Sequence, residues 1–76
     1  MLMFYVYVLN NKRTNRLYVG YTENLKRRFN EHKEKEPDVE LIYYEAYSFK
    51  KHAQSRERKL KLYGSAWRGL KKRLGL

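Results

Sequence analysis

The stretch MLMFYVYVLNNKRTNRLYVGY, residues 1–21, predicts two β-strands joined by a polar turn. β-Branched and aromatic side chains dominate residues 1–10 and residues 16–21, as is typical of strands. Between them NNKRTN, residues 10–15, is rich in asparagine and favours a turn. Gly20 lies late in the second strand, where glycine often marks a bulge or a close approach of another group. The start of the chain is therefore expected to form a hairpin.

A helix is expected to follow the hairpin. Thr22 is predicted to cap it, with the first turn starting at Glu23 and the last near Lys35, because Pro37 cannot continue a helix. Leu25 and Phe29 are four residues apart, so they should face the sheet together.

VELIYYEAY, residues 39–47, predicts a third strand. Strict alternation would place one set of side chains on one face (Leu41, Tyr43, Glu45, Tyr47) and the rest on the other (Ile42, Tyr44, Ala46).

Two helices are expected to complete the chain. The first covers residues 50–62, with Phe49, Ala53 and Leu60 as its apolar stripe and Gly64 as its stop. Ser65 is predicted to cap the second, whose stripe holds Trp67, Leu70 and Leu74. The order β-β-α-β-α-α indicates one α+β domain over residues 1–76, with a small three-stranded mixed or antiparallel sheet and flanking helices.

Charge is unevenly distributed along the chain. The net charge is +10, yet residues 1–49 hold eight Lys/Arg against seven acids, and residues 50–76 hold ten against one. A basic third on a small domain favours a nucleic-acid partner, with DNA expected and RNA left open. The residues expected to contact it are Lys50, Lys51, Arg56, Lys71, Lys72 and Arg73. No membrane span or cysteine is present, which excludes a disulfide framework and favours the cytoplasm.

Glu57 is the single acid of that basic segment, and its spacing places it beside Ala53 and Leu60 on the face that meets the sheet. A carboxylate there needs a partner. Lys61, four residues on, is one candidate. The other is a divalent ion such as Mg²⁺, which takes one or two carboxylates and shares a substrate phosphate.

Three further residue types suggest chemistry. Arg28 and His32 are four apart on the first helix, where Arg suits phosphate and His suits proton transfer. Tyr5 and Tyr7 share a face of the first strand, and a hairpin of this size could bring the hydroxyls of Tyr7 and Tyr18 to one end of the sheet. A solvated helix flank and aromatic core packing are the alternative interpretations.

Together these residues make the chain resemble the GIY-YIG nuclease family, and in particular its small stand-alone bacterial members. YVY at Tyr5–Tyr7 is similar to the Gly-Ile-Tyr motif, and YVG at Tyr18–Gly20 to the Tyr-Ile-Gly motif. Arg28, His32 and Glu57 lie where the family carries its helical Arg, a frequent His and its metal-binding Glu. The leading Gly is replaced by Tyr5, and Tyr21 stands where some relatives carry Lys. Related domains include the N-terminal nuclease of the excinuclease C subunit.

The resemblance implies a mechanism. One Mg²⁺ or Mn²⁺ held by Glu57 would stabilise the leaving 3′ oxygen, Arg28 would share the phosphate charge, and water would attack in line. Tyr7 would act as base, with Tyr18 as its orienting partner, although the resemblance leaves those two roles open. His32 would relay the proton, because free tyrosine has a pKa of about 10.

The expected function is thus a metal-dependent DNA endonuclease in repair or recombination, with a protein partner as one possible source of specificity. The alternative is a non-catalytic nucleic-acid-binding module on the same fold, in which Glu57 forms a salt bridge and the tyrosines stack.

Overall fold

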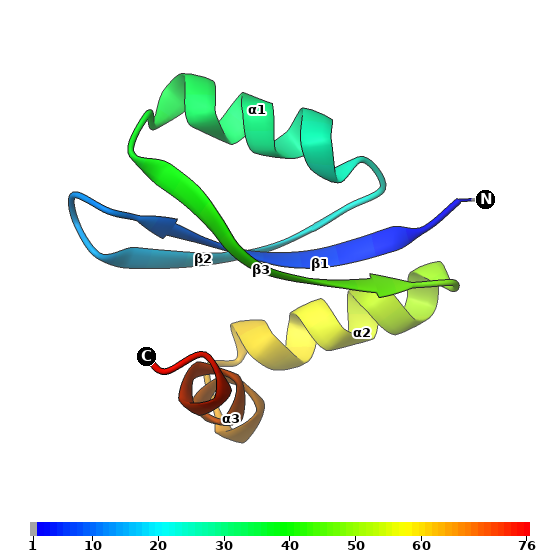
Figure 1. The fold of residues 1–76 in the computed structure, drawn as a ribbon. Helices are drawn as coiled ribbons and strands as arrows, with labels where there is room; N and C mark the ends of the chain where they lie inside the picture. The colour runs from blue at the N-terminus through cyan, green and yellow to red at the C-terminus, as the bar shows by residue number, and fades with distance from the viewer. Residues whose placement is uncertain (1) are drawn as a thin grey trace.

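The computed structural model of the protein describes residues 2–76, and Met1 lies outside the described residues. Its elements follow the order that the sequence predicts, β-β-α-β-α-α (Figure 1). They are β1 (Phe4–Asn11), β2 (Arg16–Thr22), α1 (Leu25–Lys35), β3 (Val39–Tyr47), α2 (Lys50–Lys61) and α3 (Ser65–Arg73).

β1 lies at the centre of the three-stranded sheet, whose order is β2-β1-β3, and both pairings are antiparallel. The predicted α+β class is therefore confirmed, and the sheet is antiparallel rather than mixed. In this order β2 is an edge strand. Tyr7 is opposite Gly20 on β2 and opposite Tyr44 on β3, so these three positions form one row across the sheet.

The hairpin turn is built by its asparagines. The Asn11 side chain accepts hydrogen bonds from the backbone N–H groups of Arg13 and Thr14, and Asn15 adopts a positive φ of 62°. Asparagine tolerates both roles, which explains the asparagine-rich turn that the sequence shows. Asn11 also donates to Glu36 beyond the end of α1, so the turn is tied to that helix.

The start of α1 differs from the prediction. Asn24, not Thr22, is the N-cap, and its side chain accepts a hydrogen bond from the Arg27 backbone N–H at 3.0 Å. Thr22 remains in β2, where its hydroxyl accepts a hydrogen bond from the Asn24 N–H. Both residue types cap helices well, and continued pairing of Thr22 with Tyr5 keeps Thr22 in the strand.

The side chains of β3 also depart from strict alternation. The register shifts between Val8 and Leu9, because Val8 is opposite Tyr43 while Leu9 is opposite Leu41, which leaves Ile42 as an extra residue. Such a bulge changes which face the following side chains meet. Leu41 lies on the α1 face, and Ile42 packs with Tyr43 against the core on the other face, so the predicted placement of both Leu41 and Ile42 is wrong.

The helices form a layer on each side of the sheet, with α1 on one face and α2 and α3 on the other (Figure 1). The core lies between the sheet and the α2–α3 pair, and its buried members are Val6, Val8, Val19, Ala53, Leu60, Trp67 and Leu70. The predicted stripe of the last helix is confirmed, and Leu74 packs on its edge. No helix within residues 2–76 has the length and hydropathy needed to cross a membrane.

The ends of α2 and α3 need two corrections. Phe49 is 60% exposed because it precedes α2 as an extended N-cap, so it does not belong to the apolar stripe. Gly64 occupies the N-cap of α3, and Ser65 is already the first helical residue.

Candidate active site

Tyr7 lies in the middle of β1, with its side chain on the α1 face and only 3% exposed. Its ring occupies the space above Gly20, where a Cβ atom would clash with the ring carbons and the hydroxyl. The hydroxyl is 2.9 Å from Nε2 of His32 on α1. Gly20 thus allows the Tyr7 ring to lean across β2 and reach the helix.

His32 projects from α1 and is half-buried against the Tyr7 ring. Burial lowers its pKa below the ordinary value of 6.5, and the nearby Arg28 cation lowers the pKa further. The imidazole is therefore neutral at neutral pH, and Nε2 can accept the Tyr7 hydroxyl proton while Nδ1 carries the ring hydrogen.

Arg28 lies one turn before His32 on the same flank of α1. The Tyr7 hydroxyl is the largest cause that raises the pKa of the Arg28 guanidinium, and the hydrogen bond to Glu31 raises that pKa further. The Arg28–Glu31 ion pair measures 3.2 Å, and the Arg28 side chain is 47% exposed. A permanent cation is thus held beside Tyr7 with part of its surface open to an anion.

Tyr18 is on the same face but does not meet Tyr7. It is opposite Leu9 on β1, and its hydroxyl donates to Glu36 at 3.3 Å. Because Glu36 follows His32 by one helical turn, the two tyrosines contact neighbouring turns of the same helix. Glu36 was missed from the sequence, although its spacing from His32 was a usable signal.

Glu57 is located away from this group. It lies on α2, which covers the opposite face of the sheet, and its Oε2 is 3.1 Å from Nζ of Lys61. The expected ion pair with Lys61 therefore forms, and the Glu57 side chain remains 20% exposed.

Tyr21 on β2 is influenced by the charge of Glu57. Burial raises the Tyr21 pKa, and the carboxylates of Glu23 and Glu57 raise it further. Its hydroxyl is buried and has no hydrogen-bond partner among the described residues. In the sequence, Tyr21 is notable only as a departure from relatives. Its unpaired hydroxyl and the influence of Glu57 make it a further candidate residue of the site.

The residues around Glu57 fit a hydrated divalent ion. Within residues 2–76 no three acidic, His or Cys side chains converge as a protein-only metal cage would require. Mg²⁺ needs no such cage, since it keeps several waters and often binds one carboxylate plus a substrate phosphate. A water bound to such an ion is a suitable partner for the unpaired Tyr21 hydroxyl.

Glu45 is the other carboxylate of interest, and it has a structural role. Two hydrogen bonds from Arg56 at 3.0 Å and one each from Tyr43 and Tyr47 surround it. Burial would raise its pKa, but these donors outweigh burial and the pKa falls. Glu45 thus forms an ion pair with Arg56 that joins β3 to α2.

The predicted nucleic-acid contacts lie at both ends of the α2–α3 layer. Lys50, Lys51, Lys72 and Arg73 are exposed, and Lys71 is half-exposed. Arg56 differs from them, because its guanidinium is held by Glu45 and its side chain is 26% exposed. It is therefore the least available of the six to a phosphate.

The family model of the GIY-YIG catalytic domain matches residues 3–73 of the 76-residue chain. The chain belongs to the GIY-YIG family. This GIY-YIG domain is thus of a nuclease type that acts on DNA, and nucleases of this family generally depend on a divalent metal. No curated protein and no solved structure is significantly similar to the chain, so the assignment rests on the family model.

Proposed function

We propose that this GIY-YIG domain is a divalent-metal-dependent endonuclease that hydrolyses DNA phosphodiester bonds at the edge of β2. The hydrogen bond from Tyr7 to a neutral His32, beside Arg28, carries this proposal. A phenol, a proton acceptor and a cation are the groups that a phosphodiesterase needs around one phosphate.

Two groups of side chains would meet around the β2 edge. Tyr7, Arg28 and His32 lie above β2, and Tyr21 and Glu57 lie on the side that α2 covers. Within residues 2–76 β2 has no strand on its outer side, so a phosphate placed there can be reached from both faces. With a substrate phosphate shared between the two faces, a divalent ion would not need three protein ligands on either face alone.

The chain's own residues would then divide the work. Arg28 binds a non-bridging oxygen of the phosphate and offsets the charge that builds up as water attacks phosphorus. Tyr7 takes the proton of that water as its own proton passes to Nε2 of His32. A divalent ion at Glu57 would supply charge stabilisation for the leaving 3′ oxygen. The P–O3′ bond breaks, leaving a 5′-phosphate and a 3′ oxyanion, which takes a proton from solvent to become the 3′-hydroxyl, while His32 returns its extra proton to solvent.

Tyr18 would act indirectly in this scheme. Its bond to Glu36 fixes the end of α1, and thereby the position of His32 one turn earlier. We therefore favour Tyr7 over Tyr18 as the base. Work in DNA repair or recombination, and a protein partner that supplies specificity, stay predictions from the sequence.

Incubation with labelled DNA tests the proposal. Supercoiled plasmid and single-stranded oligonucleotides are incubated with Mg²⁺, Mn²⁺ or EDTA, using the wild type, Arg28→Ala and Glu57→Gln. Arg27→Ala is the matched control, because Arg27 is an exposed neighbour on α1. Metal-dependent cleavage that both site variants lose and the control keeps supports the endonuclease. Binding without cleavage in every metal contradicts it.

The non-catalytic alternative has one observation in its favour, the Glu57–Lys61 ion pair. Lys61→Gln separates the two interpretations. If Glu57 is a metal ligand, release from Lys61 leaves cleavage intact or lowers the metal concentration it requires. If Glu57 is only an ion-pair partner in a non-catalytic module, Glu57→Gln and Lys61→Gln lower the melting temperature equally, and neither they nor the wild type cleave DNA.

A further inference from the structure

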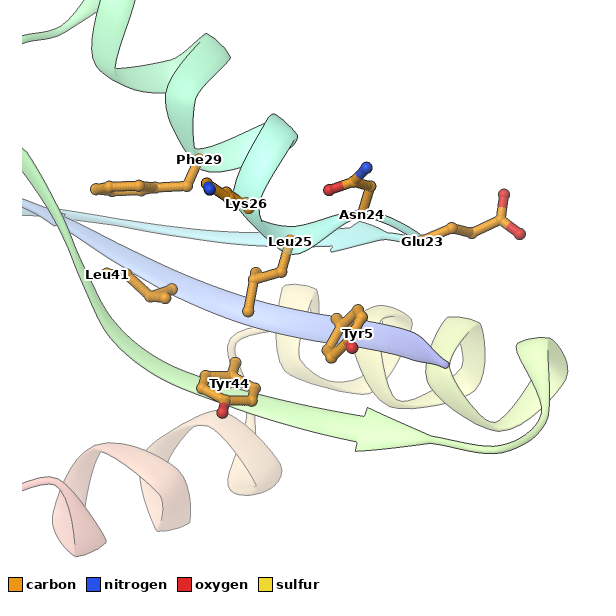
Figure 2. Close-up of a pocket in the computed structure, with 8 residues that line it drawn as sticks. All are labelled: Tyr5, Glu23, Asn24, Leu25, Lys26, Phe29, Leu41 and Tyr44. Atoms are coloured by element: carbon orange, nitrogen blue, oxygen red, sulfur yellow. The ribbon is translucent and has the colours of Figure 1, made fainter. Parts of the chain in front are cut away.

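An open aromatic cleft lies beside the candidate active site, between the first turns of α1 and strands β1 and β3 (Figure 2). Its volume is about 460 Å³. Its lining includes Tyr5, Glu23, Leu25, Lys26, Phe29 and Tyr44. In Figure 2 Leu25 points from the helix toward the strands, while Glu23 points away from the rings.

The cleft exists because α1 covers its face of the sheet incompletely. Leu25 and Phe29 face the sheet as predicted, yet no residue of α1 is fully buried. Tyr44 is 53% exposed although it occupies the middle of a strand. The Tyr7 ring leans toward Gly20, on the opposite side of β1 from Tyr44, and so does not fill this space.

The walls of the cleft are flat aromatic rings. Tyr5 and Tyr44 form an edge-to-face pair with ring centroids 6.1 Å apart. Phe29 contributes a third ring from the helix (Figure 2). Stacking on such rings is the usual way in which proteins hold unpaired nucleobases, whatever their sequence.

The residues that line the cleft are neighbours of the candidate active site in the sheet and in α1. Tyr44 is opposite Tyr7 in the sheet, and Tyr5 precedes Tyr7 by two residues on the same face, about 7 Å along the strand. Phe29 follows Arg28 in α1. A strand of DNA whose phosphate contacts Arg28 therefore has a neighbouring base within reach of the cleft.

We propose that this cleft binds one unpaired nucleobase next to the cleaved phosphate, stacked against Tyr44 and Tyr5, with Lys26 near the adjoining backbone. The proposal rests on the proposed function and narrows its substrate to single-stranded or locally unpaired DNA. A base within a duplex is already stacked on both sides and can enter only after it leaves the helix. A second copy of this chain is a poor occupant, since each copy carries a charge of +10.

Binding measured in EDTA tests the cleft without any need for cleavage. The probes are a fluorescent single-stranded oligonucleotide and the same sequence as a duplex, with anisotropy as the readout. Tyr44→Ala should weaken single-strand binding about tenfold and leave duplex binding unchanged, as loss of one stacked base predicts. Tyr44→Trp should retain single-strand affinity. Phe49→Ala removes a comparably exposed ring outside the cleft and should change neither affinity.

Abasic substitution then locates the base. Removing one base at successive positions of the oligonucleotide should weaken wild-type binding at one position, and Tyr44→Ala should add nothing there. Equal loss on single strand and duplex, or no loss at all, overturns the proposal and leaves the cleft free for a protein segment. If the wild type cleaves DNA but Tyr44→Ala does not weaken single-strand binding, the base-binding role of the cleft is rejected and the proposed nuclease activity stands. If Tyr44→Ala weakens single-strand binding as expected but the wild type does not cleave DNA, the proposed nuclease activity is rejected and the base-binding role of the cleft stands.

Discussion

Gly20 is the residue on which the geometry of Tyr7 depends. It leaves room for the ring to lean over β2, and any Cβ at this position would meet the ring end. The hydrogen bond to His32 and the contact with Arg28 both involve the hydroxyl at that end. The absence of a side chain at Gly20 therefore determines where Tyr7, the proposed general base, is positioned.

Gly20→Ala should reduce cleavage at least tenfold while the protein remains folded. The added methyl pushes the Tyr7 hydroxyl away from His32, and overpacking costs about 1–3 kcal/mol in stability. Single-turnover cleavage and a denaturant melt measure the two effects. Gly69→Ala is the control, because a Cβ there meets nothing within 4 Å, and in helix α3 it should stabilise by about 0.5–1 kcal/mol. Unchanged cleavage in Gly20→Ala would show that the ring position does not matter.

His32 should give cleavage an acid limb below pH 6.5. Its folded pKa is lowered by burial and by Arg28, so the neutral ring that accepts from Tyr7 is retained below the ordinary value of 6.5. The associated stability is fully present above pH 6.5 and is lost as pH falls through the lower folded pKa, because the unfolded chain binds the proton first. A pH–rate profile checks the limb, which His32→Gln should remove. An acid limb at or above pH 6.5, or one that persists in His32→Gln, would assign it to another group.

At the candidate site, spacing along the chain predicts which side chains share a flank or an end of the sheet, but not which of them form contacts. Helical spacing predicts that Arg28 and His32 share one flank of α1. Hairpin length predicts that the Tyr7 and Tyr18 hydroxyls come to one end of the sheet, and in the structure they contact neighbouring turns of α1 instead of each other. The pairing of Tyr18 with Glu36 depends on register and on the length of α1, which spacing alone does not determine. The same holds for Tyr21, whose buried, unpaired hydroxyl is a property of packing between β2 and α2.

Among the elements, β3 and α2 are joined by the ion pair of Glu45 with Arg56. Its side chains are only 15% and 26% exposed, and two tyrosine hydroxyls complete the carboxylate's partners. This network fixes α2, and with it Glu57, against the sheet.

Glu45→Gln should lower the free energy of unfolding by about 2 kcal/mol at pH 7, because it leaves a half-buried Arg56 without its counter-charge. The folded pKa of Glu45 is lowered, so its contribution is complete above the ordinary carboxyl value of 4.5 and is lost as pH falls through the folded pKa. Urea melts at pH 7 and pH 3 should show the difference shrinking in acid. Asp38→Asn breaks the exposed pair with Arg13 and should cost less than about 1 kcal/mol. Equal effects of the two substitutions would contradict the structural role of Glu45.

The number and type of elements followed from local pattern, and the errors lie at their joints. Asn24 rather than Thr22 caps α1 because β2 extends to Thr22 in pairing with β1. The bulge at Ile42 turns Leu41 toward α1, and no local residue signals it. Both features arise from pairing between strands, which a one-dimensional pattern does not contain.

At the scale of the whole molecule, the α2–α3 layer concentrates the positive charge. Lys71→Gln and Lys72→Gln should each reduce the slope of log affinity against log salt for DNA, by about 0.7 on single strands and 0.9 on duplex, if each lysine contacts a phosphate. Lys12→Gln removes the same charge from the hairpin turn and should leave the slope unchanged. Anisotropy titrations between 50 and 200 mM salt, a range over which such slopes are resolved, provide the measurement. Equal effects of all three substitutions would indicate a diffuse charge effect without a defined surface.

The central claim concerns the β2 edge, where side chains from both faces of the sheet would share one phosphate. Mn²⁺ titration of isotope-labelled protein, followed by paramagnetic broadening of its amide signals, tests this claim most directly. The account predicts that residues 20–22 and 56–58 broaden at the lowest Mn²⁺ concentrations and that this broadening is lost in Glu57→Gln. When a short oligonucleotide is added, the broadening should extend to the Arg28 side chain. Broadening confined to the surface acids of α1, or unchanged in Glu57→Gln, would contradict the account.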